Sequence, residues 1–164
     1  MAIEAWMPRE PGQMHRNRFR NGGIDQKIGG HMQAYFGVAI VTLLASLVCF
    51  GMSAMVARTH ARTGILAPTM TGDPLLERTI RGHLNTLEWI PIFLPSMWLF
   101  AIYWSPLWAA ALGSLWIVGR IIYFIGYRAA AQKRFPGFFI QVCATFALLL
   151  GALGRIIYLM ATAT

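Results

Sequence analysis

Four long apolar segments separated by short polar stretches dominate the chain. They cover about Gln33–Ala57, Glu77–Tyr103, Leu107–Tyr127 and Gly137–Met160. Each is at least as long as the roughly 20 residues that an α-helix needs to cross the hydrocarbon core of a bilayer. None alternates polar and apolar residues with a period of two, so membrane-spanning strands are not expected. The pattern predicts an all-α, integral membrane four-helix bundle.

The polar stretches between these segments fix how the helices connect. The link Trp104-Ser105-Pro106 is so short that the second and third helices must form a tight antiparallel hairpin. Residues 1–32 are polar and basic, and we expect a flexible tail there, followed by a transmembrane domain at 33–164. The first apolar run is too long for the core of a signal peptide, which has about 7–15 apolar residues, so it is kept as a span.

Composition agrees with a lipid environment. The 164 residues are 57% hydrophobic and 12% charged, and the formal net charge is +8. A soluble domain has about 25% charged residues. The basic residues flank the apolar runs, which fits lipid headgroups, a topology signal or an anionic substrate better than nucleic acid. Because basic residues concentrate in the first and third loops, we expect those loops in the cytoplasm. No retention signal indicates which membrane.

The cysteines and histidines predict no redox or metal chemistry. Cys49 and Cys143 both lie inside apolar runs and are expected to be small buried hydrophobes. The four histidines are scattered and form no helical His-x-x-x-His pair, so no metal site is predicted.

Polar residues interrupt the second predicted helix along one face. Arg81, Asn85 and Glu88 follow one another at i, i+4 and i+7, which places them on the same side of a helix. A charge at the centre of a spanning helix costs roughly 2.5–3.5 kcal/mol even on lenient scales. Glu88 therefore needs a partner, and Arg81 and Arg120 are the candidates.

The third predicted helix carries a matching face with Arg120, Tyr123 and Tyr127. Arg134 would join this face if the helix continued beyond the membrane surface. One interpretation is an ion-pair lock between helices, with the tyrosines as interfacial belt residues. The other is a polar ligand site, which the surplus of arginines favours. Arginine forks bind carboxylates and a glutamate can hold an amine, so a small anionic molecule such as glutathione would fit.

Spaced polar positions on these two helices resemble the motifs of the MAPEG family, membrane-associated proteins of eicosanoid and glutathione metabolism. The matching stretches are Arg81-x-x-x-Asn85-x-x-Glu88-x-x-Pro91, Arg120-x-x-Tyr123-Phe124-x-Gly126-Tyr127 and Gln132-Lys133-Arg134. The resemblance runs from about Ala34 to the C-terminus. It is nearest to the branch that holds leukotriene C synthase and the second microsomal glutathione transferase.

The resemblance implies a homotrimer whose sites lie between neighbouring subunits near the cytosolic face, with glutathione as co-substrate. It implies that Arg134 is catalytic and stabilises the glutathione thiolate, which is the nucleophile that attacks a lipophilic electrophile from the bilayer. The residues that it implies for glutathione binding are Arg58, Arg81, His83, Asn85, Glu88, Arg120, Tyr123 and Tyr127.

Two departures from that branch shape the predicted activity. Trp89 stands where the branch has a tyrosine, and Arg58 is followed by Thr59 instead of a second arginine. Both disfavour leukotriene synthesis. We therefore predict a detoxifying glutathione transferase for hydrophobic electrophiles, with peroxidase activity on lipid hydroperoxides as a second reaction. The alternatives are a non-catalytic lipid-presenting protein of the same family, and a structural bundle or small transporter.

Overall fold

A computed structural model describes residues 32–163, so nearly all of the tail predicted at residues 1–32 lies outside the described residues. From Tyr35 onward the chain forms four long helices and one short 3-10 helix. These are α2 (Phe36–Thr63), α3 (Pro74–Tyr103), α4 (Pro106–Ala129), η1 (Ala131–Arg134) and α5 (Phe135–Thr162). All four long helices have the length and hydropathy of membrane spans. The predicted all-α membrane fold is confirmed.

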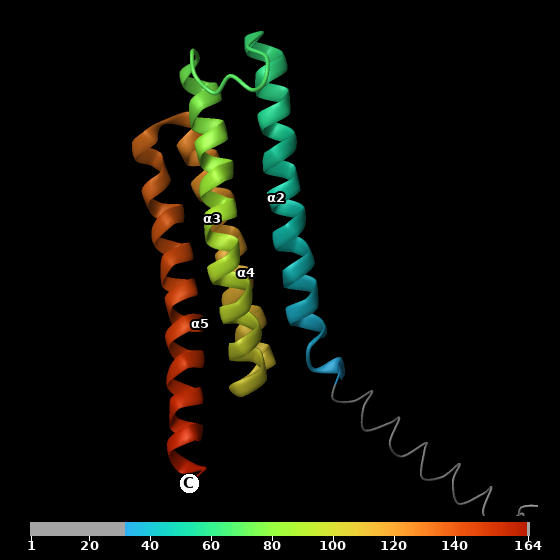
Figure 1. Cartoon of the computed structure of the whole chain (residues 1–164), viewed down its shortest axis with the longest axis vertical. Coiled ribbons are helices and arrows are strands. Elements are labelled where there is room, and N and C mark those ends of the chain that lie inside the picture. The colour runs from blue at the N-terminus through green and yellow to red at the C-terminus, as the bar shows by residue number, and fades with distance from the viewer. Residues whose placement is uncertain (1–31, 164) are drawn as a thin grey trace, which may run out of the picture. The chain divides into compact units, whose positions relative to one another are not determined.

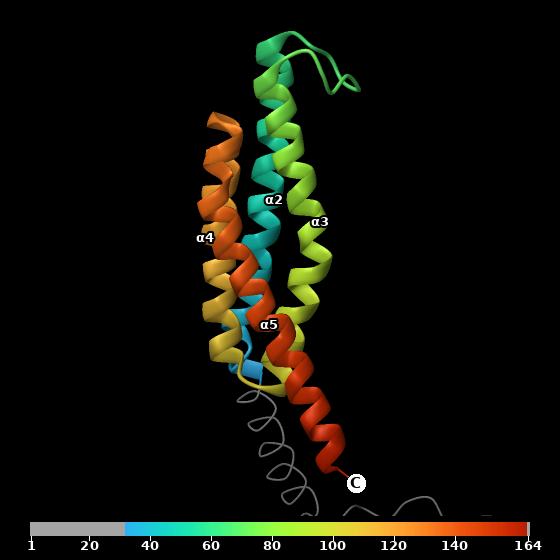
Figure 2. The same ribbon diagram turned by 90° about the vertical axis from the view of Figure 1, so that its left-hand side faces the viewer.

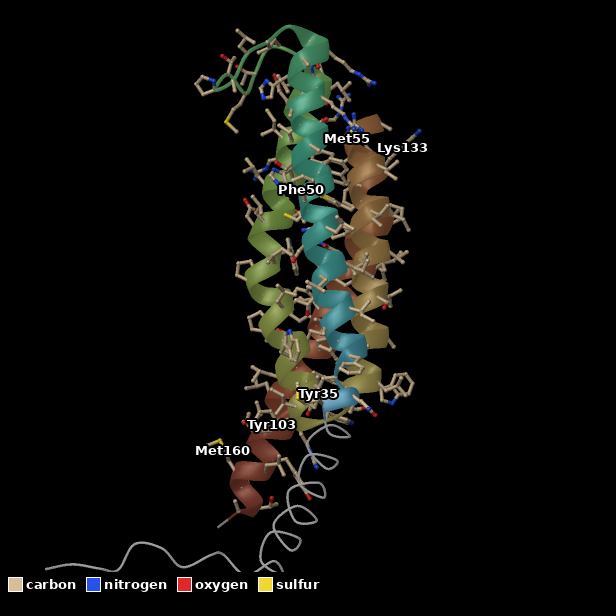
Figure 3. All side chains as sticks on the ribbon, turned by 90° about the vertical axis from the view of Figure 1, so that its right-hand side faces the viewer. Tyr35, Phe50, Met55, Tyr103, Lys133 and Met160 are labelled. Carbon is tan, nitrogen blue, oxygen red and sulfur yellow. The ribbon has the colours of Figure 1, made fainter. Side chains whose placement is uncertain are left out.

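The four helices run side by side, with α4 in contact with each of the other three (Figure 1). The α2–α3 loop and η1 lie toward one end of the bundle, and the α3–α4 link and the C-terminal end of α5 lie toward the other (Figure 2). Figure 3 shows Lys133 of η1 and Tyr103 of α3 toward these opposite ends. The first and third loops therefore share one end of the bundle, as expected when each helix crosses the membrane in the direction opposite to the helix before it.

Local sequence signals set the helix starts. Asp73 precedes α3 and its side chain accepts a hydrogen bond from the Leu76 backbone N–H at 2.8 Å, with Pro74 in the first turn. Ser105 precedes α4 in the same way, with Pro106 as the first helical residue. Both arrangements satisfy a free N–H at a helix start and use the fixed φ of proline. The predicted tight hairpin between α3 and α4 is confirmed.

The bundle buries residues where its helices meet and turns other large apolar residues outward. Phe93 of α3 stacks on Trp116 of α4 with ring centroids 4.0 Å apart, and both side chains are fully buried. The side chains of Leu43 and Phe50 of α2 are 70% and 72% exposed. An apolar outer surface is expected where lipid replaces water as the solvent.

Close contact between α4 and α5 fixes the part of α4 that carries polar residues. A Cβ at Gly137 of α5 would collide with the backbone nitrogen of Tyr123, so only glycine allows this approach. Gly119 of α4 faces the backbone of Gln141 in the same contact.

The cysteines correct one expectation. Cys143 lies on the exposed surface of α5, and Cys49 is partly buried, so the prediction that both are buried is wrong. Both have free thiols.

Candidate functional site

A fully buried arginine lies where α3 meets α4. Arg120 has no exposed surface, and its two terminal nitrogens donate to the Asn85 side-chain oxygen at 3.1 Å and the Asn85 backbone oxygen at 2.8 Å. The Asn85 side-chain amide in turn donates to a Glu88 carboxylate oxygen at 3.1 Å. Asn85 thus bridges the cation and the acid. The expectation that Glu88 pairs directly with Arg81 or Arg120 is wrong. Its hydrogen-bond partner is the Asn85 amide, which also accepts from Arg120.

Aromatic rings cover the Arg120 guanidinium. Its central carbon lies 4.9 Å from the ring centre of Tyr123 and 5.6 Å from that of Trp116, within the range of cation–π attraction. Its Nε is buried without a hydrogen-bond partner among the described residues. The rings and the two oxygens of Asn85 therefore stabilise a cation that has lost its water entirely.

Arg134 reaches the same region by a turn of the chain. The helix α4 ends at Ala129, Ala130 is extended with φ −159° and ψ 147°, and η1 follows. The Arg134 guanidinium carbon then lies 5.0 Å from the ring centre of Tyr127. The helix does not continue to Arg134, which was the condition set from the sequence for Arg134 to join the face of Tyr127, yet the two residues meet through this turn.

Gly126 makes this turn possible. A Cβ at Gly126 would collide with the carbonyl oxygen of Lys133, which packs directly on the α4 backbone. The glycine therefore lets η1 fold back onto α4 and brings Arg134 over Tyr127.

A cavity of about 240 Å³ opens between these groups. It draws side chains from α3, α4, η1 and α5, and its lining residues are Arg81, Asn85, Tyr123, Tyr127, Arg134, Phe135 and Phe138. Five of these were predicted from the sequence as site residues. Arg120 and Glu88 are not among the lining residues. Both are hydrogen-bonded to Asn85, which is, and the Glu88 side chain is exposed next to it.

Phe135 and Phe138 are the two lining residues that sequence reasoning missed. Phe138 lies 6.4 Å from Tyr123 and 6.2 Å from Trp89, measured between ring centres. Phe135 and Phe138 are 58% and 39% exposed, so they form an apolar wall that faces outward from the bundle. Their spacing by one helical turn directly after Arg134 was the available signal.

Two predicted residues, His83 and Arg58, do not line this cavity. His83 lines a separate cavity of about 340 Å³ together with Cys49 and other residues of α2 and α3. Arg58 is exposed near the end of α2, a helix that contributes nothing to the lining of the 240 Å³ cavity. Within one chain the structure therefore does not bring His83 or Arg58 into the 240 Å³ cavity.

The chemistry of the cavity suits a small anion. Neither Arg81 nor Arg134 makes a side-chain hydrogen bond or an ion pair within the described residues, and the Arg134 guanidinium lies over the rings of Tyr127 and Phe135. Both guanidinium groups are therefore available to a carboxylate or a thiolate. No group of three metal-ligating side chains occurs among residues 32–163.

Four membrane-length helices and a cavity with free guanidinium groups define a multi-pass membrane protein with a site suited to a small anionic ligand. Comparison with known proteins gives the family. The sequence model of the MAPEG family matches residues 38–154, which include parts of all four long helices, and the chain belongs to this family.

Individual relatives span most of the chain. Microsomal glutathione S-transferase 2 of Homo sapiens is 35% identical over 118 residues, 71% of this chain and 80% of the relative. Leukotriene C4 synthase of Cavia porcellus is 32% identical over 127 residues, 77% of this chain and 85% of the relative. An uncharacterized protein of Synechocystis sp. is 42% identical over 120 residues, 73% of this chain and 88% of the relative.

Proposed function

We propose that this protein is a membrane glutathione transferase that joins the glutathione thiolate to hydrophobic electrophiles. One observation carries the proposal: the 240 Å³ cavity holds two guanidinium groups, an amide and two phenols against an outward-facing aromatic wall. The names of its relatives, a glutathione S-transferase and a leukotriene C4 synthase, support glutathione as the co-substrate.

The proposed roles follow from the chemistry of each group. Arg81 pairs with a glutathione carboxylate, and Glu88 holds the amine, with Asn85 fixed between Glu88 and the buried Arg120. Tyr123 and Tyr127 line the cavity as hydroxyl donors. Arg134 stabilises the thiolate, since a nearby guanidinium favours the ionised form of a thiol.

The same wall suggests how the second substrate arrives. Phe135 and Phe138 line the cavity and are also exposed on the outer surface of the bundle. A lipophilic electrophile, or a lipid hydroperoxide in a peroxidase reaction, would reach the sulfur along this apolar surface from the bilayer. The rival proposal, a non-catalytic lipid-presenting protein, leaves the position of Arg134 over the cavity without a role.

A conjugation assay with a matched control tests the proposal. Detergent-solubilised protein is incubated with glutathione and 1-chloro-2,4-dinitrobenzene, and Arg134→Ala is compared with Lys133→Ala. A thiol without cationic help is only a few per cent ionised at neutral pH, so we expect Arg134→Ala to lose about 10-fold or more in rate. Lys133 is exposed and does not line the cavity, so its variant should keep the rate. Glutathione binding without turnover in the wild-type protein would support lipid presentation instead.

We further propose a homotrimer in which Arg58 and His83 complete the cavity of a neighbouring subunit, with the first and third loops in the cytoplasm. Both residues lie outside their own chain's cavity, and the basic loops share one end of the bundle. Random co-assembly of Arg58→Ala and Arg134→Ala chains tests this arrangement. About one quarter of the sites would combine an intact Arg134 with a neighbour's intact Arg58, so activity should return in mixed but not in separate preparations. Sites built within one chain would show no such recovery.

A further inference from the structure

A second cavity lies against the proposed glutathione site, at the loop end of the bundle. It has a volume of about 390 Å³ and is lined by Met70, Thr71, Glu77, Arg78, Ile80, Arg81, Leu84 and Tyr127. Arg81 and Tyr127 line both cavities, so they form a common wall. The outer wall comes from the α2–α3 loop, where Thr71 and Met70 are exposed.

In this outer cavity the acidic group has a hydrogen-bond partner within the protein, whereas most of the guanidinium donors do not. The single acid, Glu77, accepts a hydrogen bond from the Gly72 backbone N–H at 3.0 Å and so holds the loop. Arg78 donates only its Nε, to the carbonyl oxygen of Arg128 at 3.2 Å. The terminal nitrogens of Arg78 and the whole guanidinium of Arg81 have no hydrogen-bond partner among the described residues. The outer cavity therefore offers more free donors to an anion than acceptors to a cation.

We propose that this outer cavity is a capture subsite for the carboxylates of glutathione, through which the tripeptide passes to the inner cavity. This inference rests on the proposed function. Arg78, which no other part of the proposed site uses, would hold a carboxylate together with Arg81. Arg81 lines both cavities, so it would keep its contact with the carboxylate while the tripeptide moves from Arg78 to Asn85 and Arg134.

The location explains why such a subsite would act on the rate of association. The outer cavity is formed by the loop end of the bundle, where the α2–α3 loop hangs beside α3 (Figure 2). Charged clefts raise association rates of oppositely charged ligands by about 10- to 1000-fold, and salt weakens the effect over a Debye length of about 10 Å. A subsite that is left behind after capture lowers the barrier to entry and to exit alike, so it changes the association and dissociation rates by the same factor and leaves the equilibrium dissociation constant unchanged.

Two threonines in the same loop provide a matched test. Thr71 lines the outer cavity, whereas Thr69 is exposed two residues away and does not line it. Neither threonine side chain makes a hydrogen bond within the described residues, so a substitution breaks no side-chain hydrogen bond of the fold. Arg78 itself is less suitable as the first variant, because it also caps the C-terminal end of α4 through Arg128.

The measurement is stopped-flow binding of glutathione to the detergent-solubilised full chain at several salt concentrations. We expect Thr71→Glu to slow association about threefold or more at low salt, Thr71→Lys to speed it, and Thr69→Glu to change it much less. The dissociation rate should change by the same factor as the association rate, so that the equilibrium dissociation constant stays the same in all three. Equal effects of Thr71→Glu and Thr69→Glu, or a change confined to dissociation, would overturn the capture subsite. If wild-type protein binds no glutathione at all, the proposed function fails instead.

Discussion

The bridge from Arg120 through Asn85 to Glu88 allows a sharp test of why a cation is buried in this bundle. In Asn85→Ala the side-chain oxygen that accepts from Arg120 at 3.1 Å is lost, while the backbone oxygen that accepts at 2.8 Å remains. The substitution therefore removes one of two hydrogen bonds from a guanidinium that has no access to water.

The size of the effect follows from these contacts. A hydrogen bond to a charged group contributes about 1.5–3 kcal/mol, and a buried donor left without a partner loses about that amount. Glu88 is exposed on the single chain, so the loss of its bond to Asn85 adds little. Alanine gains about 0.5 kcal/mol over asparagine in helix propensity. We expect Asn85→Ala to lower the free energy of unfolding by about 1–2.5 kcal/mol.

Arg120→Met should behave in the opposite way. This variant removes the buried cation together with its desolvation cost, and a methionine fills a similar apolar space between Trp116 and Tyr123. Replacing buried charges by apolar side chains of similar volume is often neutral or stabilising by about 1–4 kcal/mol. We therefore expect Arg120→Met to be as stable as the wild type or more stable, and the double variant to be no worse than Arg120→Met alone.

Both variants should nevertheless lose glutathione binding, since Asn85→Ala removes the amide, Arg120→Met frees it from its partner, and each loosens the position of Glu88. Unfolding is followed by circular dichroism during titration of dodecyl sulfate into mixed micelles, and binding by calorimetry. A functional site predicts that Arg120→Met keeps stability and loses binding. If Arg120→Met unfolds more easily than Asn85→Ala, Arg120 is a structural lock and the reasoning is wrong.

Three further predictions address other parts of the site. Removal of Arg134 should raise the pKa of the bound glutathione thiol toward about 8.5, so Arg134→Ala should be most impaired near neutral pH and recover at alkaline pH, as thiolate absorbance would show. Gly126→Ala should displace η1 by collision with the carbonyl of Lys133 and cost about 1–3 kcal/mol of stability together with activity, whereas Ala129→Gly in the same turn should spare activity. Glu88→Gln should raise the KM for glutathione with little change in kcat, because the amide holds the substrate amine less tightly than a carboxylate does.

The fold could be predicted from the sequence because lipid leaves few choices. Apolar runs of this length must satisfy their backbone hydrogen bonds internally, and a helix does so without partners. Capping residues and prolines then fixed the starts of α3 and α4. The main difference is at the end of α2, which runs to Thr63 instead of the predicted Ala57. Its last turns are polar, and a hydropathy pattern marks only the apolar part of a helix, so it does not detect the polar turns that follow.

The site was predictable only where helical periodicity operates. Arg81 and Asn85 on α3 and Tyr123 and Tyr127 on α4 were placed by the turn of about 100° per residue, and they do line one cavity. That Asn85 would bridge Arg120 and Glu88 was not predictable, because periodicity says nothing about which side chain lies between two others.

The turn that carries Arg134 shows a different limit. Residues 129–131 are three alanines, the best helix formers, yet Ala130 is extended and ends α4. The cause is tertiary. The chain must return along α4 so that Gly137 can pack against Tyr123, and the fold-back over Gly126 is what that return requires. Local propensity favours a longer helix, and close packing between α4 and α5 overrides it.

A comparison of two arginines supports the proposal that the charges of the site serve ligand binding. Arg155 near the end of α5 donates to the Tyr103 carbonyl and stays half-buried, so it can reach the headgroup region at low cost. Arg120 has no such outlet. A structural lock would need one acid in contact with it, yet the nearest acid, Glu88, is reached only through Asn85.

Further cations gather where a lock would need none. Arg81 and Arg134 line the cavity beside Asn85, and no described acid lines it with them. Arg81 is exposed and Arg134 half-buried, so water screens part of the repulsion between these like charges, and the remainder mildly disfavours the empty bundle. An anionic ligand would remove that repulsion and would gain from every one of these groups at once. The arrangement is mildly unfavourable for an empty bundle and favourable for one that binds an anion, and this difference supports the proposed binding site over a structural lock.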